Sequence, residues 1–469
     1  TVDGITSLST STSGTSNFIA GVNAGNSITS GGNYNTVVGD EAGTAITTGD
    51  SNIGVGFGAV KAATTGSQNV GVGVNTLATL TTASYNTALG TSALTANTSG
   101  ANNVAVGTNA LEANTTGTGN SALGADALND CTTGDYNVAI GYQSQRLTTT
   151  ADDNTGLGAY TLYDNTTGTA NVAVGFSALA NNTTANNNTA VGYNSLTTNT
   201  TGTVNTATGW YSLNLNTTGS QNAAFGERAL RSNTTASFNT AMGALALTAN
   251  TTGTRNTAVG TSALDASTTA NYNSAFGTHA GSSITTGSLN SVFGDYALAA
   301  TTTGASNSAF GQSALGQNTT GHSNTAVGQN CLYGNTQGLR NTALGLNAGA
   351  GVTNGDNNTM IGEAAGNHSV ATTVGNQNTL IGSQTRCDAY NSNPTVAIGY
   401  DVAGTGGYTT LGNAGSDIRA LHGNITWATV SDERYKKDIV DSTAGLSFIN
   451  ALQPRTWKYK TLGELPETF

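Results

Sequence analysis

The chain has 469 residues, enough for several globular domains, yet it holds 63 glycines, only 3 prolines and just 8% charged residues. Such low charge, with apolar residues recurring at fixed intervals, argues against intrinsic disorder. The net charge of −11 disfavours nucleic acid and anionic membrane surfaces as partners. No apolar stretch reaches about 18 residues, so we expect no membrane insertion.

Residues 1–34 precede the regular part of the sequence. They show no basic region followed by an apolar core, so we expect no signal peptide. Residues 17–21 follow the later repeat pattern one residue out of step. We therefore expect an N-terminal cap with irregular coils.

Residues 35–382 repeat with a period of 17. Glycine occupies every seventeenth position from Gly39 to Gly362, twenty anchors without an insertion, and asparagine precedes each by four positions, from Asn35 to Asn358. A period held this strictly is typical of a solenoid in which each repeat forms one coil. Positions within a coil are counted below from its anchor glycine, so asparagine stands at −4.

One repeat shows the parts of a coil: Asn256 at −4, Val259 at −1, the anchor Gly260, Ala263 at +3 and Leu264 at +4. The segment from −4 to −1 predicts a short strand, and the anchor turns a corner where a side chain would clash. The +3/+4 pair predicts a second short strand, and Asn-Thr-Thr-Gly at +7 to +10 predicts the return turn. Coils stacked about 4.8 Å apart would form a rod of roughly 90 Å, with the asparagines in a hydrogen-bonded ladder.

The fold class expected is therefore all-β, a parallel β-solenoid. Its strand is apolar at both −2 and −1, so both faces of the strand need burial. Small −2 residues suit the thin interior of the coil, whereas the larger −1 residues must be covered from outside. We infer a parallel homo-oligomer, for which three chains are the most economical closed arrangement.

The motif Asn-Thr-Ala-Val-Gly followed by Ala-Leu, as in residues 256–264, resembles the head repeats of trimeric autotransporter adhesins. The resemblance covers residues from about 17 to 412 and implies a left-handed parallel β-roll, although those heads typically use shorter coils.

Two outward columns offer candidate binding surfaces. Threonine fills +8 from Thr47 to Thr353, and threonine arrays of this kind can bind ice. Adjacent threonines on a strand point to opposite faces, however, so they do not form one flat surface. We therefore favour a turn ladder, in which the threonine side chains of successive turns contact one another. At +1, Phe176, Tyr193 and Trp210 fall in consecutive coils. They are candidates for a glycan strip, with a structural or interfacial ladder as the alternative.

No metal site or cofactor is expected. The four histidines and three cysteines are isolated along the sequence, and no nucleotide-binding glycine motif is present. Asp152 and Asp153 are adjacent, so they cannot form the facing carboxylate pair of a glycoside hydrolase. An enzyme acting on an external substrate is therefore not expected.

The regular spacing ends after Gly362. Anchor intervals become 20, 17 and 13, through Gly382, Gly399 and Gly412, and Pro394 is the first proline. This predicts terminal coils that pass into a neck over residues 383–430.

Residues 431–469 have a different composition, with 12 charged residues in 39 against 27 in the preceding 430. A helix is predicted to start with Ser431 as its N-cap, a second helix over residues 445–452, and a strand over residues 457–460. These elements predict a short α+β module.

The module contains Ser-Asp-x-Arg-x-Lys-Lys-x-Ile, then Gly-Leu-x-Phe-Ile-x-x-Leu-x-Pro, then Trp-Lys-Tyr. This order resembles the start of the chaperone-of-endosialidase domain, an intramolecular chaperone of phage tail fibres and tailspikes. The resemblance implies that the domain trimerises the chains, templates folding and then cuts itself off. It also implies Ser431 as nucleophile, Lys436 as general base and Val430–Ser431 as the scissile bond. On the residues alone, Ser431 would be a helix cap and Lys436 a solvated charge.

The family domain continues beyond this strand, so residues 431–469 are expected to be its incomplete start. The sequence predicts a homotrimeric fibre of a virion, extracellular, with other virion tail proteins and a host cell-surface glycan or protein receptor as partners. A bacterial trimeric surface adhesin is the alternative, although the export signal and membrane anchor it needs are not apparent. An ice-binding solenoid is a weaker alternative.

Overall fold

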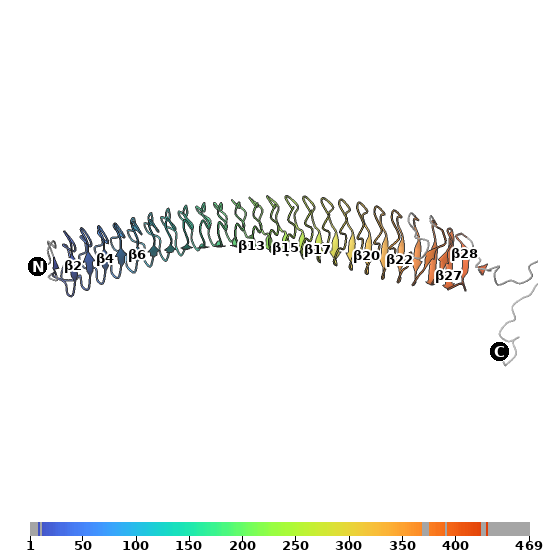
Figure 1. Cartoon of the computed structure of the whole chain (residues 1–469), viewed down its shortest axis with the longest axis horizontal. Helices are drawn as coiled ribbons and strands as arrows, with labels where there is room; N and C mark the ends of the chain where they lie inside the picture. Colours follow the sequence, from blue (N-terminus) through green and yellow to red (C-terminus); the bar gives the residue numbers. More distant parts are fainter. Residues whose placement is uncertain (1–7, 10–11, 368–374, 390–391, 424–427, 430–469) are drawn as a thin grey trace, which may run out of the picture.

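The computed structural model describes residues 8–9, 12–367, 375–389, 392–423 and 428–429. These residues form a long, gently curved rod of stacked coils (Figure 1). All regular elements in these ranges are β-strands, and none of the described residues belongs to a helix that could cross a membrane. The predicted α+β module at residues 431–469 lies outside the described residues.

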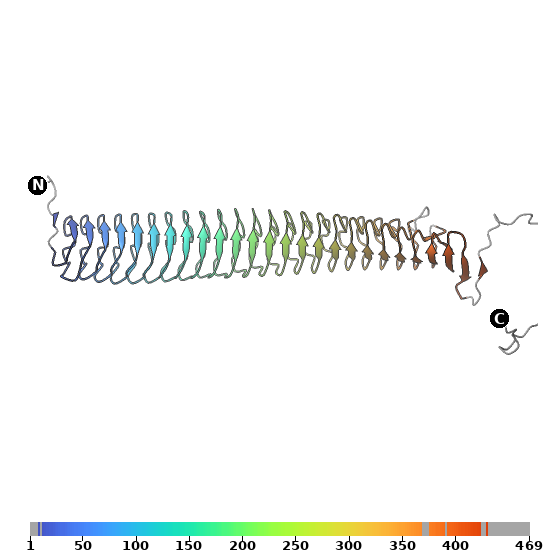
Figure 2. The same ribbon diagram turned by 90° about the horizontal axis from the view of Figure 1, so that it is seen from below.

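Each coil of the main stack contributes one three-residue strand, and the strands lie side by side and point the same way (Figure 2). These strands are β2 (Phe18–Ala20), β3 (Thr36–Val38), β4 (Ile53–Val55), β5 (Val70–Val72), β6 (Thr87–Leu89), β7 (Val104–Val106), β8 (Ser121–Leu123), β9 (Val138–Ile140), β10 (Thr155–Leu157), β11 (Val172–Val174), β12 (Thr189–Val191), β13 (Thr206–Thr208), β14 (Ala223–Phe225), β15 (Thr240–Met242), β16 (Thr257–Val259), β17 (Ser274–Phe276), β18 (Ser291–Phe293), β19 (Ser308–Phe310), β20 (Thr325–Val327), β21 (Thr342–Leu344), β22 (Thr359–Ile361) and β23 (Thr379–Ile381).

The remaining strands lie at the two ends of the rod. They are β1 (Leu8–Ser9), β24 (Arg386–Cys387), β25 (Val396–Tyr400), β26 (Ala403–Gly404), β27 (Tyr408–Asn413), β28 (Ile418–Leu421) and β29 (Ala428–Thr429). Strands β25 and β27 continue the parallel stack, whereas β1, β28 and β29 pair antiparallel and β24 pairs with β26 in a small second sheet.

The pairing between coils keeps one register along the main stack. Between β16 and β17, for example, Ala258 pairs with Ala275 and Val259 with Phe276, a shift of 17 residues. Equivalent positions of the repeat therefore lie above one another as columns. The predicted all-β parallel solenoid with 17-residue coils is confirmed.

The anchor position requires glycine. Gly260 has a φ of +134°, and a Cβ added there would lie 2.4 Å from the carbonyl oxygen of Gly277 in the next coil. Neither the backbone angle nor the space accepts a side chain. The anchor glycine thus lets the corners of successive coils approach closely enough to stack.

The −4 asparagines form the predicted ladder inside the rod. Asn256 is fully buried, and its backbone N–H donates to Oδ1 of Asn239 at 2.9 Å. Its Nδ2 donates to the carbonyl oxygen of Ala270 at 2.8 Å, and its own Oδ1 accepts from the N–H of Asn273 at 3.0 Å. Each amide therefore ties the strand of its own coil to the turn and to both neighbouring coils.

A second, shorter asparagine ladder occupies +7. Nδ2 of Asn250 donates to Oδ1 of Asn233 at 2.9 Å and to the carbonyl oxygen of Gly253 at 3.0 Å. The sequence pattern had indicated only a turn at this position. Because the side chain also closes its own turn, the +7 asparagine both shapes the coil and links it to the previous one.

The predicted second strand at +3/+4 is wrong. Leu264 has a φ of +53°, in the left-handed region, so the backbone cannot run on as an extended strand there. The segment is a turn in which the N–H of Ala263 donates to Gly260 O at 3.3 Å. Leu264 still points inward and is fully buried, so the turn delivers the apolar side chain that the strand was expected to supply.

The two faces of the strand differ as expected. The −2 residue is buried, as Ala258 is, whereas larger −1 residues stay substantially exposed: Leu123 is 49%, Phe225 40% and Met242 46% exposed. The −1 residues therefore form an outward apolar stripe, called here the −1 stripe, along one face of the rod.

Candidate functional site

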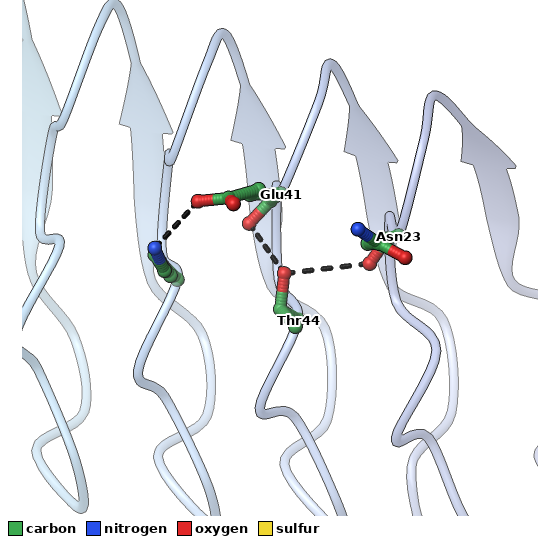
Figure 3. A network of polar contacts seen from close by, with 4 residues as sticks. Asn23, Glu41 and Thr44 are labelled. Carbon is green, nitrogen blue, oxygen red and sulfur yellow. Dashed lines mark hydrogen bonds and ion pairs between the residues drawn. The ribbon is translucent and has the colours of Figure 1, made fainter.

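Positions +1, +2 and +5 lie on the outer surface just past the anchor glycine. In the N-terminal coils Asn23 and Glu41 stand at +2 and Thr44 at +5, and Oγ1 of Thr44 donates to the carbonyl oxygen of Glu41 at 2.7 Å and to that of Asn23 at 3.3 Å (Figure 3). Nζ of Lys61, at +5 of the next coil, donates to the Glu41 carboxylate. A +2 side chain thus meets the +5 side chain of the following coil.

The same surface carries a continuous row of aromatic rings in the middle of the rod. Successive rings are 5.4–5.7 Å apart between centroids over five consecutive coils, and the last two rings, within one coil, are 4.6 Å apart. The rings of this aromatic row are Tyr142, Tyr160, Phe176, Tyr193, Tyr211 and Trp210, with Tyr163 beside Tyr160.

The three sequence candidates lie in this row, but their rings do not offer equal surfaces. Phe176 and Tyr193 are 44% and 45% exposed, yet they stack on each other with 13° between their planes, so one face of each is covered. The other neighbouring pairs are tilted or edge-to-face, with 57–89° between their planes, and Trp210 stands at 84° to Tyr211. Phe176 and Tyr193 are therefore the stacked pair of the row, whereas Trp210 makes an edge-to-face ring contact.

Two arginines adjoin that end. The guanidinium of Arg228 lies 4.6 Å from the ring centroid of Trp210, and that of Arg231 lies 5.9 Å from the ring of Tyr211. Together these four side chains line a pocket of about 210 Å³. The Arg231–Tyr211 pair repeats the +5/+2 relation of Lys61 and Glu41.

Another arginine stands near the opposite end of the row. Nη1 of Arg146 donates to the hydroxyl oxygen of Tyr163 at 2.9 Å, and this hydrogen bond raises the pKa of Arg146 above its usual value. Both ends of the aromatic row therefore carry a guanidinium.

Sequence reasoning found only the +1 members of the row. Tyr160 and Tyr211 stand at +2, and Tyr160 bridges the coil in which +1 is an alanine, Ala159. Arg228 and Arg231 stand at +2 and +5. Comparing all three columns together would have found these residues, since the three columns share one surface.

The +8 threonines use their hydroxyls within the rod. Oγ1 of Thr251, for example, donates to the carbonyl oxygen of Thr268 in the next coil at 3.0 Å, and Thr268 donates in turn to Thr285 O at 3.2 Å. This is the expected turn ladder. The single donor of each hydroxyl is thus used within the rod, and only its acceptor lone pairs can face solvent.

The described part of the chain contains no group of three or more His, Cys, Asp or Glu side chains that could hold a metal ion. Cys131, Cys331 and Cys387 are separate and fully buried. The aromatic row is the candidate binding surface among the described residues.

Ser431 and Lys436, the predicted self-cleavage residues, lie outside the described residues, and so does Val430. The family model described as chaperone of endosialidase matches residues 431–468. No curated protein matches the chain. The chain therefore joins a long β-solenoid to a C-terminal segment that is similar to the chaperone-of-endosialidase family.

Proposed function

We propose that this chain forms the shaft of a homotrimeric virion fibre that attaches to a host surface and is assembled by a C-terminal intramolecular chaperone. The observation that carries the proposal is the family match at residues 431–468, which directly follows the solenoid. A rod is suited to projecting from a particle, and the matched family supplies an assembly module for it.

The −1 stripe supports the trimer. It contains a stack of three phenylalanines, in which Phe276 and Phe293 have centroids 4.7 Å apart and Phe293 and Phe310 4.9 Å apart, and all three are 36–38% exposed. A contiguous apolar surface of this length is unfavourable in water and marks an interaction site. Three parallel copies, each turning its −1 stripe to a common axis, would cover all three stripes.

The uniformity of the repeat explains the need for a chaperone. Because the anchor, ladder and −1 columns recur every 17 residues, a slip of one coil between neighbouring chains would preserve nearly all of their contacts. The repeats alone therefore specify the register poorly. A templating module at one end of the three chains would set it once for the whole shaft.

Self-cleavage would release the finished shaft from its template. Oγ of Ser431 would attack the carbonyl carbon of Val430 while the neutral amine of Lys436 accepts the hydroxyl proton. The C–O bond forms, the C–N bond breaks, and the proton passes from Lys436 to the departing amino group of Ser431. Water then hydrolyses the ester, leaving a carboxylate on Val430 and restoring the serine hydroxyl.

Cleavage is tested by following the purified full chain by gel electrophoresis and intact mass. We expect a product ending at Val430, and we expect Ser431→Ala and Lys436→Ala to abolish it. Lys437→Ala is the matched control, since it removes the adjacent charge and should leave cleavage intact. Cleavage at Val430 that persists in Ser431→Ala would contradict the proposed mechanism.

Assembly is tested by native mass measurement of the same protein. We expect a trimer, and we expect Phe293→Asp to shift it towards monomer, since a carboxylate would be buried in the stripe. Thr286→Asp, on an exposed column of a neighbouring coil, is the control and should remain trimeric. A wild-type monomer would refute the fibre.

The location is tested by labelling intact particles with antibody against the shaft. Label on projecting virion fibres is the expected result. Label on the surface of a bacterial cell, with none on particles, would favour the adhesin alternative instead.

A further inference from the structure

We propose that the pocket lined by Trp210, Tyr211, Arg228 and Arg231 binds an acidic sugar, a monosaccharide unit carrying a carboxylate, sulfate or phosphate group. The inference rests on the proposed function in host attachment and names the chemistry of the attachment point. It narrows the candidate glycan surface from the whole aromatic row to one end of it.

The pocket offers the two kinds of contact that an acidic sugar needs. Trp210 is 42% exposed, and the part of its ring that the Arg228 guanidinium leaves uncovered supplies an aromatic surface for the apolar C–H groups of a sugar ring. A guanidinium held over an aromatic ring still has N–H groups at its edge that can donate to an anion. Arg228 and Arg231 each lie near a ring and both line the same hollow of about 210 Å³.

The positive charge is local, and the chain does not neutralise it. The two coils that carry the pocket, residues 205–238, hold two arginines and one acid, Glu227, a net charge of +1 in a chain of −11. Glu227 approaches Arg228 only to 3.8 Å, with 53% of its own side chain exposed. Arg231 has no ion-pair partner among the described residues. Two closely spaced, weakly paired guanidiniums favour an anion from outside.

The fold does not require these side chains. The coils anchored at Gly90 and Gly107 carry Thr91 and Thr108 at +1, with the same parallel strand pairing as the coil of Trp210. The coil of Trp210 is also where the −1 stripe is interrupted by a polar residue, Thr208. A coil that departs from the repeat on its outer surface while keeping its strand register points to a role other than stacking.

A second copy of the chain is the competing occupant of the pocket, since rows of rings also occur at subunit contacts. Such a contact would have to bury two arginines, and the only ion pair that either makes among the described residues is that of Arg228 with the half-exposed carboxylate of Glu227. An acidic sugar supplies the missing charge and leaves the guanidiniums partly in water. The charge balance therefore favours the sugar.

The test measures binding to the full chain by calorimetry at low ionic strength. The probes are oligogalacturonate for carboxylate, dextran sulfate oligomers for sulfate, glucose 6-phosphate for phosphate and dextran as the neutral control. We expect at least one acidic probe to bind about tenfold more tightly than dextran, because charge-assisted hydrogen bonds to guanidinium are strong. The probe that binds identifies the acidic group.

The variants locate the site. Arg228→Gln with Arg231→Gln should weaken binding of that probe about tenfold or more. Arg255→Gln is the matched control, because Arg255 also lies over two rings, Phe238 and Tyr272, but does not line the pocket, so binding should be unchanged. Trp210→Ala should weaken binding and leave the native mass of the assembly unaltered.

Equal binding of dextran, no binding of any acidic probe, or an equal loss in Arg255→Gln would each overturn the inference. Dissociation of the assembly by Trp210→Ala would also overturn it, because the pocket would then be a subunit contact. None of these results bears on whether the unmodified chain forms a trimer or cleaves itself, so the proposed fibre would stand. A wild-type monomer would refute the fibre whatever the sugars do.

Discussion

The inner and outer columns of the same coils behave as two different regions of the molecule. Inside, the position of Asn256 is asparagine in every regular coil and that of Gly260 is always glycine. Outside, the position of Trp210 is filled elsewhere by residues as different as Thr91 and Asp295, with no change in strand register. Stacking is therefore specified from within, while the outer surface is free to vary along the rod and to carry recognition.

The largest effect is expected from a side chain at an anchor. Gly260→Ala places a Cβ 2.4 Å from a backbone oxygen of the next coil at a φ of +134°, so we expect a loss of about 4 kcal/mol from strain and overpacking. Hydrogen exchange should show this as lost protection in the adjacent coils, since a solenoid is stabilised by its neighbours.

Gly58→Asn is the control for the anchor. Gly58 also has a positive φ, but the next coil carries Asn75 at the same position at a φ of +54°. A Cβ at Gly58 would lie 2.6 Å from Oδ1 of Asn75, the end of a side chain that can turn away, and not against a backbone atom as at Gly260. Unchanged protection in Gly58→Asn together with a loss in Gly260→Ala would support the division between inner and outer columns. An equal loss of hydrogen-exchange protection in both variants would contradict that division.

The next largest effect is expected in the asparagine ladder. Asn256→Ala removes hydrogen bonds to the coils on both sides and leaves buried backbone groups without partners, so we expect a loss of about 3 kcal/mol. Thermal unfolding and hydrogen exchange around β16 measure it. Asn181→Ala, an exposed asparagine of an outer column, should change little. A tolerated Asn256→Ala would mean that the ladder is not needed for stacking.

The sequence predicted the inner columns well because they are periodic. Anchor glycines and −4 asparagines recur without exception, so their spacing was enough to predict parallel coils, the ladder and the inward −2 residues. The +3/+4 turn was missed, because an apolar pair such as Ala263-Leu264 is compatible both with a strand and with a turn that buries leucine at a positive φ.

The candidate site was only partly predictable. Phe176, Tyr193 and Trp210 share one column, so their alignment could be read directly from the sequence. The contacts of Trp210 with Arg228 and of Tyr211 with Arg231 cross between columns and between coils. They depend on how the backbone turns after the anchor, which the period alone does not specify.

A smaller effect, of opposite sign, is expected where the interior departs from its own pattern. Gln145 occupies a +4 position that is leucine in the neighbouring coils, Leu128 and Leu162. It is fully buried; its Nε2 donates to Val138 O at 2.7 Å, but its Oε1 has no partner in the described part of the chain. Gln145→Leu should therefore stabilise the rod by about 1 kcal/mol, measured by thermal unfolding.

The control for this change is Gln143→Leu, in an outer column of the same coil. This variant removes only a long hydrogen bond, from Nε2 of Gln143 to the Asp126 carboxylate at 3.3 Å, and Leu245 occupies the same outer position elsewhere at a φ of +63°, so the stability should stay nearly unchanged. Destabilisation by Gln145→Leu would show instead that the buried side chain of Gln145 is needed beside two other buried polar residues, Ser144 and Thr161, whose hydroxyl oxygens are 2.7 Å apart.

The smallest perturbation leaves the fold intact. It tests the difference between inner and outer columns by the reactivity of cysteine thiols in each. Burial raises the pKa of Cys131 and Cys331 to about 12 and that of Cys387 to about 11, so at pH 8 almost no reactive thiolate forms at any of the three. We expect iodoacetamide to leave the native protein unmodified and to label all three cysteines in denaturant, as measured by intact mass. Thr320→Cys, on an exposed outer column, should be labelled rapidly in the native state. Rapid native labelling of Cys331 would instead mean that the inner columns open to solvent, and stacking could not then be specified from a closed interior.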